Sequence, residues 1–181
     1  MLIKFLVGKT QGFLSNGIIA VAYAAKDDLV RMGVDEKRIT VIVNGARRLN
    51  IYDSDKTREI KKEVSILPNT TVVSIFARLE PYKDHMCFIK AAKLLIERGL
   101  DVHFLIVGSG SLEQKLKEYC DEFDISDKIS FIGYTDNVEK YMNITDINVN
   151  CSIGTETSSL ALSEGMGLSI PCVVSNFGGN P

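Results

Sequence analysis

The sequence predicts an α/β protein built on a doubly wound parallel sheet. Three observations support this class. From residue 70 onward, apolar runs of strand length alternate with amphipathic stretches of helical length. The short runs are apolar throughout, which is typical of parallel strands covered on both faces. The chain of 181 residues is 45% hydrophobic and 24% charged, so it can bury a sizeable core.

The first 70 residues predict a short βαβ stretch followed by a charged helix. Strands are expected at 17–21 and 39–43, with a helix at 24–32 between them that ends at Gly33. Asn44-Gly45 is a turn signal. The charged helix is expected at 53–64, with Ile60, Val64 and Leu67 on one apolar stripe.

The remaining elements alternate regularly. The helix at 84–98 stops at Gly99, and Ser111 opens the next helix in a capping box completed by Gln114. Two shorter helices are expected at 136–142 and 158–166. Strands are predicted at 71–77, 102–107, 129–132, 147–151 and 171–175.

Composition excludes several classes of protein. A formal charge of −2 argues against a basic face for nucleic acid. No window of about 18 uninterrupted apolar residues could span a membrane. Lys4 and Lys9 interrupt the apolar opening too early for a signal peptide.

The cysteine pattern argues against a structural zinc site. No C-x-x-C pair occurs, and His85 and His103 are the two histidines, both expected to be structural. The cysteines lie in apolar runs, which predicts four buried free thiols in a reducing, cytoplasmic compartment. They are Cys87, Cys120, Cys151 and Cys172.

The carboxyl ends of the predicted strands carry the candidate site. Ligands of open parallel sheets bind in the crevice beyond these ends. Cations, glycines and hydroxyls follow the strands, which suits an anionic, polyhydroxylated ligand. They are Arg78 and Lys83 after the first strand of the main body, then Gly108-Ser109-Gly110, then Gly133 and Tyr134, and finally Ser152, Gly154, Thr155 and Glu156.

The last loop contains two glutamates separated by seven residues, Glu156 and Glu164. A helix beginning near Ser158 would present unpaired N–H groups and its dipole to a phosphate. The groups expected to do so are those of Thr157, Ser158, Ser159 and Leu160. Glu164 would accept the hydroxyls of a ribose, Glu156 would face the reacting end of the ligand, and Arg78 and Lys83 would offset the diphosphate charge.

Some residues allow two interpretations. The Gly108 loop has Glu113 where a dinucleotide fingerprint needs its third glycine, so a nicotinamide site is not expected. Its glycines fit a turn as well as a ligand contact. Tyr134 fits the edge of a nucleobase and a structural aromatic equally well.

Several motifs together resemble one known family. ARLEPYKD, VGSGS, FIGYTDNVEKYM and NCSIGTETSSLALSEGMGLSIPCVVSNFGGNP resemble the carboxyl-terminal domain of family-four (group 1) glycosyltransferases, which have the GT-B fold of two Rossmann-like domains. The phosphate-clamp Arg and Lys of the family fall on Arg78 and Lys83, and its paired glutamates fall on Glu156 and Glu164. Thr157-Ser158-Ser159 stands where the family usually has Gly-Phe-Gly, and Gly165 where it usually has Ala.

The resemblance implies a domain plan. Residues 1–50 would be the tail of the amino-terminal, acceptor-side domain and the hinge. Residues 51–181 would be a Rossmann-like domain that binds the nucleotide-sugar donor, truncated at its end. A chain that stops straight after a strand agrees with a piece of a larger protein. Such a piece is expected to lack transferase activity and to self-associate through its first segment, or to leave that segment poorly ordered.

The resemblance also implies a chemistry. The intact enzyme would transfer a sugar from a nucleotide donor to an acceptor hydroxyl with retention of configuration, without a metal or other cofactor. The acceptor would be a glycan, a lipid-linked glycan or a small molecule, and the pathway that of a glycan or cell-surface polysaccharide. The enzyme would be cytoplasmic, or peripheral at the inner face of the membrane. Two alternatives stay open: a nucleotide-sugar epimerase of the GT-B type, and a non-catalytic nucleotide- or protein-binding Rossmann module.

Overall fold

The computed structural model describes residues 2–154 and 156–180, which group into two compact units. Unit 1 comprises Met1–Gly45, Gly154–Leu160 and Asn176–Pro181. Unit 2 comprises Ala46–Ile153 and Ala161–Ser175. The chain therefore passes from unit 1 to unit 2 after Gly45 and returns twice near its carboxyl end.

Unit 1 contains a βαβ arrangement preceded by a helix that the sequence did not predict. Its elements are α1 (Leu2–Leu14), β1 (Ile18–Ala20), α2 (Tyr23–Arg31), the 3-10 helix η1 (Glu36–Arg38) and β2 (Ile39–Val41). The two strands pair in parallel, and Ala20, Val34 and Ile39 form their small core. Glycines permit the close packing of α1, because a Cβ at Gly8 would lie 2.2 Å from the Met32 carbonyl oxygen.

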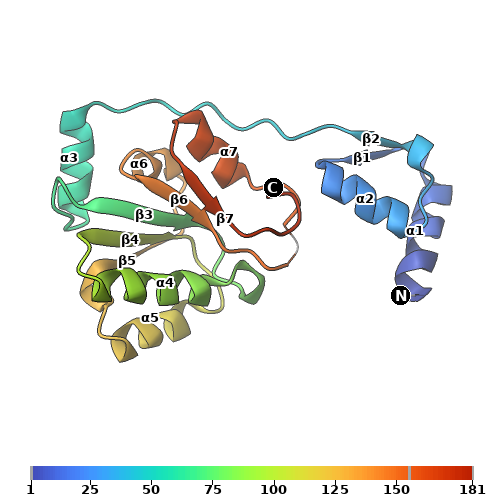
Figure 1. Cartoon of the computed structure of the whole chain (residues 1–181). Coiled ribbons are helices and arrows are strands. Elements are labelled where there is room, and N and C mark those ends of the chain that lie inside the picture. Colours follow the sequence, from blue (N-terminus) through green and yellow to red (C-terminus); the bar gives the residue numbers. More distant parts are fainter. Residues whose placement is uncertain (1, 155, 181) are drawn as a thin grey trace. The chain divides into compact units, whose positions relative to one another are not determined.

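Unit 2 is a five-stranded, fully parallel sheet (Figure 1). The strands lie in the order β5-β4-β3-β6-β7. β4 is buried at all six of its residues, as expected of a strand covered on both faces. The strands are β3 (Thr71–Phe76), β4 (Val102–Val107), β5 (Ile129–Gly133), β6 (Ile147–Asn150) and β7 (Cys172–Val174).

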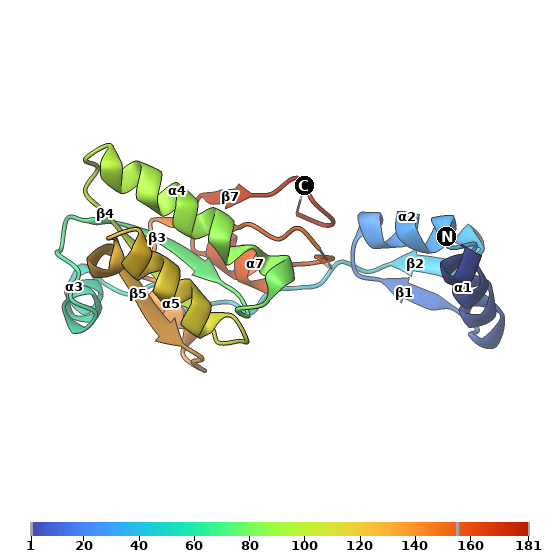
Figure 2. The same ribbon diagram turned by 90° about the horizontal axis from the view of Figure 1, so that it is seen from below.

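Helices cover both faces of this sheet. α4 (His85–Glu97) and α5 (Glu113–Glu122) pack on one face, and Figure 2 shows them in front of the strands. α3 (Ser54–Glu63) and α6 (Val138–Met142) pack on the other face, where α7 (Leu160–Gly167) also lies in Figure 1. Because successive residues of β3 point to opposite faces, Val73 and Ile75 enter the first core and Val72 enters the second. The predicted Rossmann-like, doubly wound class is confirmed.

Several local predictions need correction. Ser111 does not cap α5, which begins at Glu113, because the Ser111 side chain is hydrogen-bonded to Glu80 instead. Leu67 is 71% exposed, and its neighbour Ile66 takes the buried position below α3. The four cysteines are free thiols, but of the four only Cys120 is buried. Cys87 is exposed in the first turn of α4, and Cys151 and Cys172 are half-buried.

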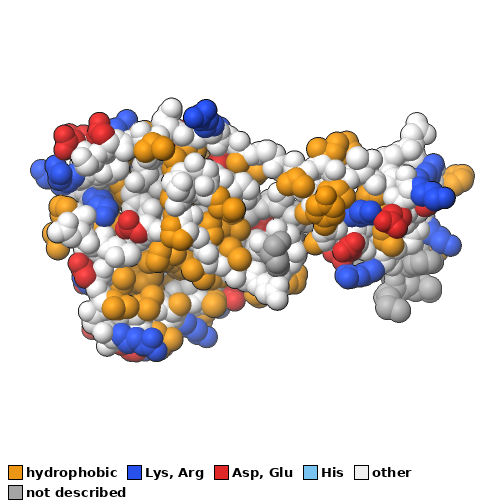
Figure 3. Space-filling model, turned by 45° about the horizontal axis from the view of Figure 1, so that its top comes forward, with side chains coloured by type: hydrophobic (Ala, Val, Ile, Leu, Met, Phe, Trp, Pro, Cys, Tyr) orange, Lys and Arg blue, Asp and Glu red, His pale blue; other side chains and the backbone are white. Residues whose placement is uncertain are grey.

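Among the described residues, no helix is both long and apolar enough to cross a bilayer. Hydrophobic side chains nevertheless reach the surface of unit 1 (Figure 3). Phe13 is 82% exposed and Ile19 is 65% exposed.

Candidate functional site

The crevice that the topology offers lies beyond the carboxyl end of β3. From β3 the chain proceeds outward through β4 and β5 on one side of the sheet, and then returns to place β6 and β7 on the other side. Such a reversal is the place where doubly wound sheets bind ligands. Arg78 follows β3 by two residues and so stands at this point.

A cavity of about 230 Å³ opens there. It brings together five residues that the sequence proposed for the site, namely Arg78, Gly108, Ser109, Tyr134 and Glu164. They come from the ends of three neighbouring strands and from α7. The rest of its wall consists of Phe76, Ala77, Val107, Thr135, Val138 and Ala161.

Glycine at position 108 allows the β3 and β4 loops to approach each other. Gly108 has φ +139°, and a Cβ there would lie 2.1 Å from the Ala77 carbonyl oxygen. Its N–H donates to the Gly133 carbonyl at 2.9 Å, which joins the β4 loop to the end of β5. Only glycine adopts this backbone without strain, so the floor of the cavity depends on it.

Glu80 fastens the Arg78 loop to the β4 loop. Its two carboxylate oxygens accept the Ser111 N–H at 3.1 Å and the Ser111 hydroxyl at 2.9 Å. These two hydrogen bonds hold the pKa of Glu80 below its usual value, helped by the nearby Arg78 charge. The Leu79 N–H also donates to the Ser109 carbonyl at 3.0 Å. The sequence alone did not predict that Glu80 would join these two loops.

Arg78 and Lys83 share one aromatic neighbour. The Arg78 guanidinium and the Lys83 ammonium each lie 5.7 Å from the centre of the Tyr82 ring. Lys83 ends the short 3-10 helix η2 (Pro81–Lys83) and is not among the residues that line the cavity. The two cations therefore occupy the same loop, with Arg78 nearer to the cavity.

Glu164 faces the cavity from α7, with a side chain that is 17% exposed. Its carboxylate Oε1 lies 3.8 Å from Nε of Arg47, a residue that the sequence analysis did not single out. The helix sits close to β6 because Asn148 donates to the Ala161 carbonyl at 2.9 Å. A Cβ at Gly165 would approach the Asn148 side-chain nitrogen to 2.7 Å. This contact gives a physical reason for the glycine that follows Glu164.

The start of the helix expected to bind a phosphate was predicted slightly too early. The structure begins α7 at Leu160 and not near Ser158. Thr157, Ser158 and Ser159 precede the helix, so of the four expected N–H groups that of Leu160 alone belongs to its first turn. Thr155 lies outside the described residues.

Glu156 belongs to unit 1, where it is 6% exposed. Glu156 and Thr157 line a pocket of about 560 Å³ in that unit, with Asp27, Asp28 and Arg31 from α2 and nearby residues. The Gly179 N–H donates to the Glu156 carbonyl at 3.0 Å, which fixes the loop against the segment after β7.

Comparisons with known proteins identify the family of the chain. The family model described as "Glycosyl transferases group 1" matches residues 56–181, which include the whole sheet of unit 2. The chain belongs to this glycosyltransferase family. Membership confirms the resemblance inferred from the motifs.

Curated relatives of this group 1 chain are themselves named as glycosyltransferases. A UDP-Gal:alpha-D-GlcNAc-diphosphoundecaprenol alpha-1,3-galactosyltransferase of Escherichia coli is 30% identical over 151 residues, which are 81% of this chain and 39% of the relative. An uncharacterized glycosyltransferase of Haemophilus influenzae is 32% identical over 116 residues, 64% of this chain and 32% of the relative. The chain thus spans about two fifths or less of the length of these relatives.

Solved structures share the fold at low identity. Anabaena HepE in complex with UDP and glucose matches with a TM-score of 0.88 and 19% identity, over 97% of this chain and 48% of that one. A glycosyltransferase from Rickettsia africae matches with a TM-score of 0.80 and 22% identity, over 90% of this chain and 45% of that one. Both confirm the Rossmann-like architecture of the family.

Proposed function

We propose that this chain is the donor-binding portion of a retaining glycosyltransferase. The intact protein would move a sugar from a nucleotide-sugar to an acceptor hydroxyl during the synthesis of a glycan or cell-surface polysaccharide. The observation that carries the proposal is the meeting of Arg78 and Glu164 in one cavity at the reversal point of the sheet. A cation and a carboxylate so placed suit a diphosphate and a ribose diol, respectively.

The size of the cavity favours the nucleoside end of the donor. About 230 Å³ is below the roughly 300–1,000 Å³ of a site for a complete drug-sized ligand. We assign the base to the side formed by Gly133 and Tyr134, whose hydroxyl donates to Asp136 at 2.6 Å. The ribose is assigned to Glu164, and the diphosphate to Arg78 and Lys83.

The remaining groups are assigned to the sugar and the departing phosphates. Glu156 and the backbone from Thr157 to Leu160 would hold the sugar and its phosphate. The acceptor hydroxyl would attack the anomeric carbon from the face that the diphosphate leaves, through an oxocarbenium-like transition state. Arg78, Lys83 and the amino end of α7 would stabilise the leaving diphosphate electrostatically. In this proposal no metal ion carries that charge, and the enzyme works in the cytoplasm or at the inner face of the membrane.

Uridine nucleotides are the first ligands to test. The named E. coli relative uses UDP-Gal, and HepE was crystallised with UDP. We expect the chain to bind UDP without added magnesium, and Arg78→Ala to weaken binding by about 1.5–3 kcal/mol, the usual value of a hydrogen bond to a charged group. Calorimetric titration measures both, and GDP and ADP establish the base preference.

A matched control is Arg98→Ala, because Arg98 is an exposed arginine at the far end of α4. This variant should bind UDP like the unaltered chain. Equal affinity in Arg78→Ala and Arg98→Ala would remove Arg78 from the site, and a strict magnesium requirement would contradict the proposed charge balance. Transfer of the sugar to an acceptor is then assayed with the intact protein of the proposal.

A further inference from the structure

The segment that enters unit 2 from Gly45 is fixed by specific contacts. Leu49 is 7% exposed and packs against Met142 and Ile170. Because these two partners come from α6 and from the approach to β7, the segment is anchored to two parts of unit 2.

Hydrogen bonds add a second anchor on α6. The Glu139 carboxylate accepts the Asn50 N–H at 3.0 Å and the Asn50 side-chain amide at 3.2 Å. These bonds are the main reason why the pKa of Glu139 lies below its usual value. Asn143 accepts the Tyr52 N–H at 2.8 Å and donates to the Asn50 carbonyl at 2.9 Å.

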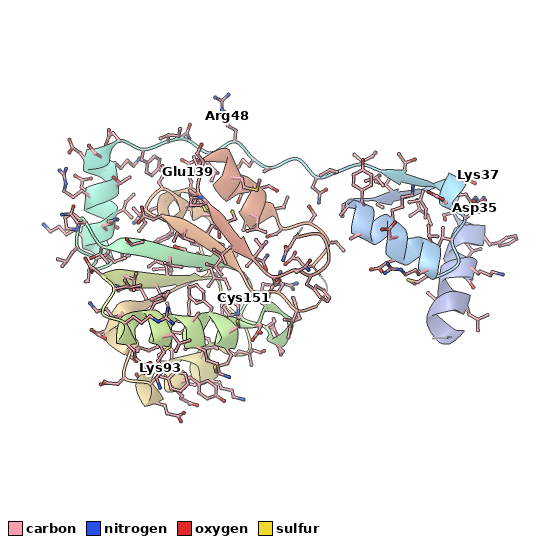
Figure 4. All side chains as sticks on the ribbon, viewed as in Figure 1. Asp35, Lys37, Arg48, Lys93, Glu139 and Cys151 are labelled. Carbon is pink, nitrogen blue, oxygen red and sulfur yellow. The ribbon has the colours of Figure 1, made fainter. Side chains whose placement is uncertain are left out.

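This double anchor determines where Arg47 lies. α6 begins at Val138, which lines the same cavity as Glu164. Arg47 lies two residues before Leu49. It is not one of the residues that line this cavity, but its Nε lies 3.8 Å from Oε1 of Glu164, which does line it. In Figure 4, Arg48 points away from the sheet, whereas Glu139 lies on the side of the segment that faces α6.

We propose that Arg47 is a positioning residue of the donor site, which acts on the ribose through Glu164. This inference rests on the proposed function. The guanidinium holds the Glu164 carboxylate turned toward the cavity, so that both oxygens can accept from the ribose hydroxyls. The connecting segment thereby becomes part of the nucleotide site.

The geometry argues against a mainly structural role for Arg47. Its side chain is 57% exposed, and ion pairs of that exposure contribute little to folding stability. Loss of Arg47 should therefore leave the fold intact and change the orientation of the Glu164 carboxylate. The effect should appear in ribose recognition rather than in the melting temperature.

The test compares UDP with 2′-deoxy-UDP on the full chain. The unaltered chain should prefer UDP by about tenfold, since a hydrogen bond from the 2′-hydroxyl to a carboxylate is lost in the deoxy ligand. Arg47→Ala should weaken UDP binding by about two- to fivefold and reduce the preference for UDP. Arg48→Ala, the matched control, should change neither quantity.

A double-mutant cycle with Glu164→Ala separates the possible roles. If Arg47 acts through Glu164, Arg47→Ala should have no further effect once Glu164 is gone. Equal weakening of UDP and 2′-deoxy-UDP by Arg47→Ala, persisting in the double variant, would show contact with the diphosphate and overturn the inference. An unchanged preference in Arg47→Ala would also overturn it. If the unaltered chain fails to bind UDP, GDP and ADP, the proposed function fails and this inference with it.

Discussion

His85 is a buried histidine held neutral by its surroundings. It is 1% exposed, and neither ring nitrogen has a hydrogen-bond partner within the described part of the chain. Burial lowers its pKa from 6.5 to about 4, with a further contribution from the Lys83 charge. The structural role predicted for this histidine agrees with its burial.

This pKa predicts a loss of stability in mild acid. Between about pH 6.5 and 4 the unfolded chain binds a proton at His85 that the folded chain does not, so stability is complete above pH 6.5 and falls toward pH 4. The loss amounts to up to about 3 kcal/mol for this group. Urea unfolding at pH 7 and pH 4.5 should show that His85→Leu loses less stability than the unaltered chain. His103→Gln should keep the His85 contribution, and parallel profiles for the unaltered chain and His85→Leu would contradict the prediction.

The two glutamates should differ in what they recognise. Glu164→Ala should weaken UDP itself by roughly tenfold or more, since its assigned partner is the ribose. Glu156→Ala should leave UDP binding intact and weaken the complete UDP-sugar, because its assigned partner is the sugar. Competition titrations with UDP and a UDP-hexose measure both effects. Equal losses for UDP in the two variants would show that this division of roles is wrong.

A site residue could be predicted from the sequence where it follows the end of a strand. Arg78, Gly108, Tyr134 and Glu164 gather in one cavity, as the strand-end rule for parallel sheets anticipates. Arg47 escaped prediction because it follows no strand end and its contact with Glu164 depends on the tertiary structure.

At the scale of elements, the strand–helix alternation was predictable but the helix starts were less so. The helices of unit 2 pack against the sheet through apolar residues at helical spacing, and this spacing can be recognised in the sequence. The first residue of a helix depends in addition on polar side chains from other parts of the chain. Ser111 matches a capping box locally, yet Glu80 binds it from the neighbouring loop. Likewise α7 begins at Leu160, two residues after the start expected near Ser158, so that Ser159 directly precedes the helix.

The β4 loop gives a prediction at this scale. Gly108→Ala would force a Cβ to 2.1 Å from the Ala77 carbonyl in a backbone of φ +139°. We expect a loss of about 1–3 kcal/mol in stability and weaker UDP binding, because the loop must withdraw from β3. Gly167→Ala is the matched control, since a Cβ there meets nothing within 4 Å. Thermal unfolding and UDP titration of both variants test this, and equal melting temperatures would contradict it.

At the scale of the whole molecule, the two units differ in how much they bury. The strands of unit 1 have three residues each, and Ala20 and Ile39 are their buried side chains, whereas β4 buries all six. Protection from hydrogen exchange follows local burial and hydrogen bonding. We therefore expect the amides of β1 and β2 to exchange much faster than those of β3 and β4. Exchange measured by mass spectrometry on the full chain gives the comparison directly.

The exposed apolar side chains of unit 1 lead to the last prediction, which is self-association. Ile19 is 65% exposed on β1, and Ile42 and Val43 are 54% and 62% exposed just after β2. A short sheet with apolar residues at its surface offers both a hydrophobic contact and unpaired backbone edges to a second copy. Light scattering after size exclusion should show a mass that rises with concentration, and Ile19→Ser should reduce that rise. Leu94→Ser is the control, since Leu94 is 56% exposed on α4 of the other unit. A chain that stays monomeric at all concentrations, with β1 as protected as β3, would mean that the strands of unit 1 are stable without further partners.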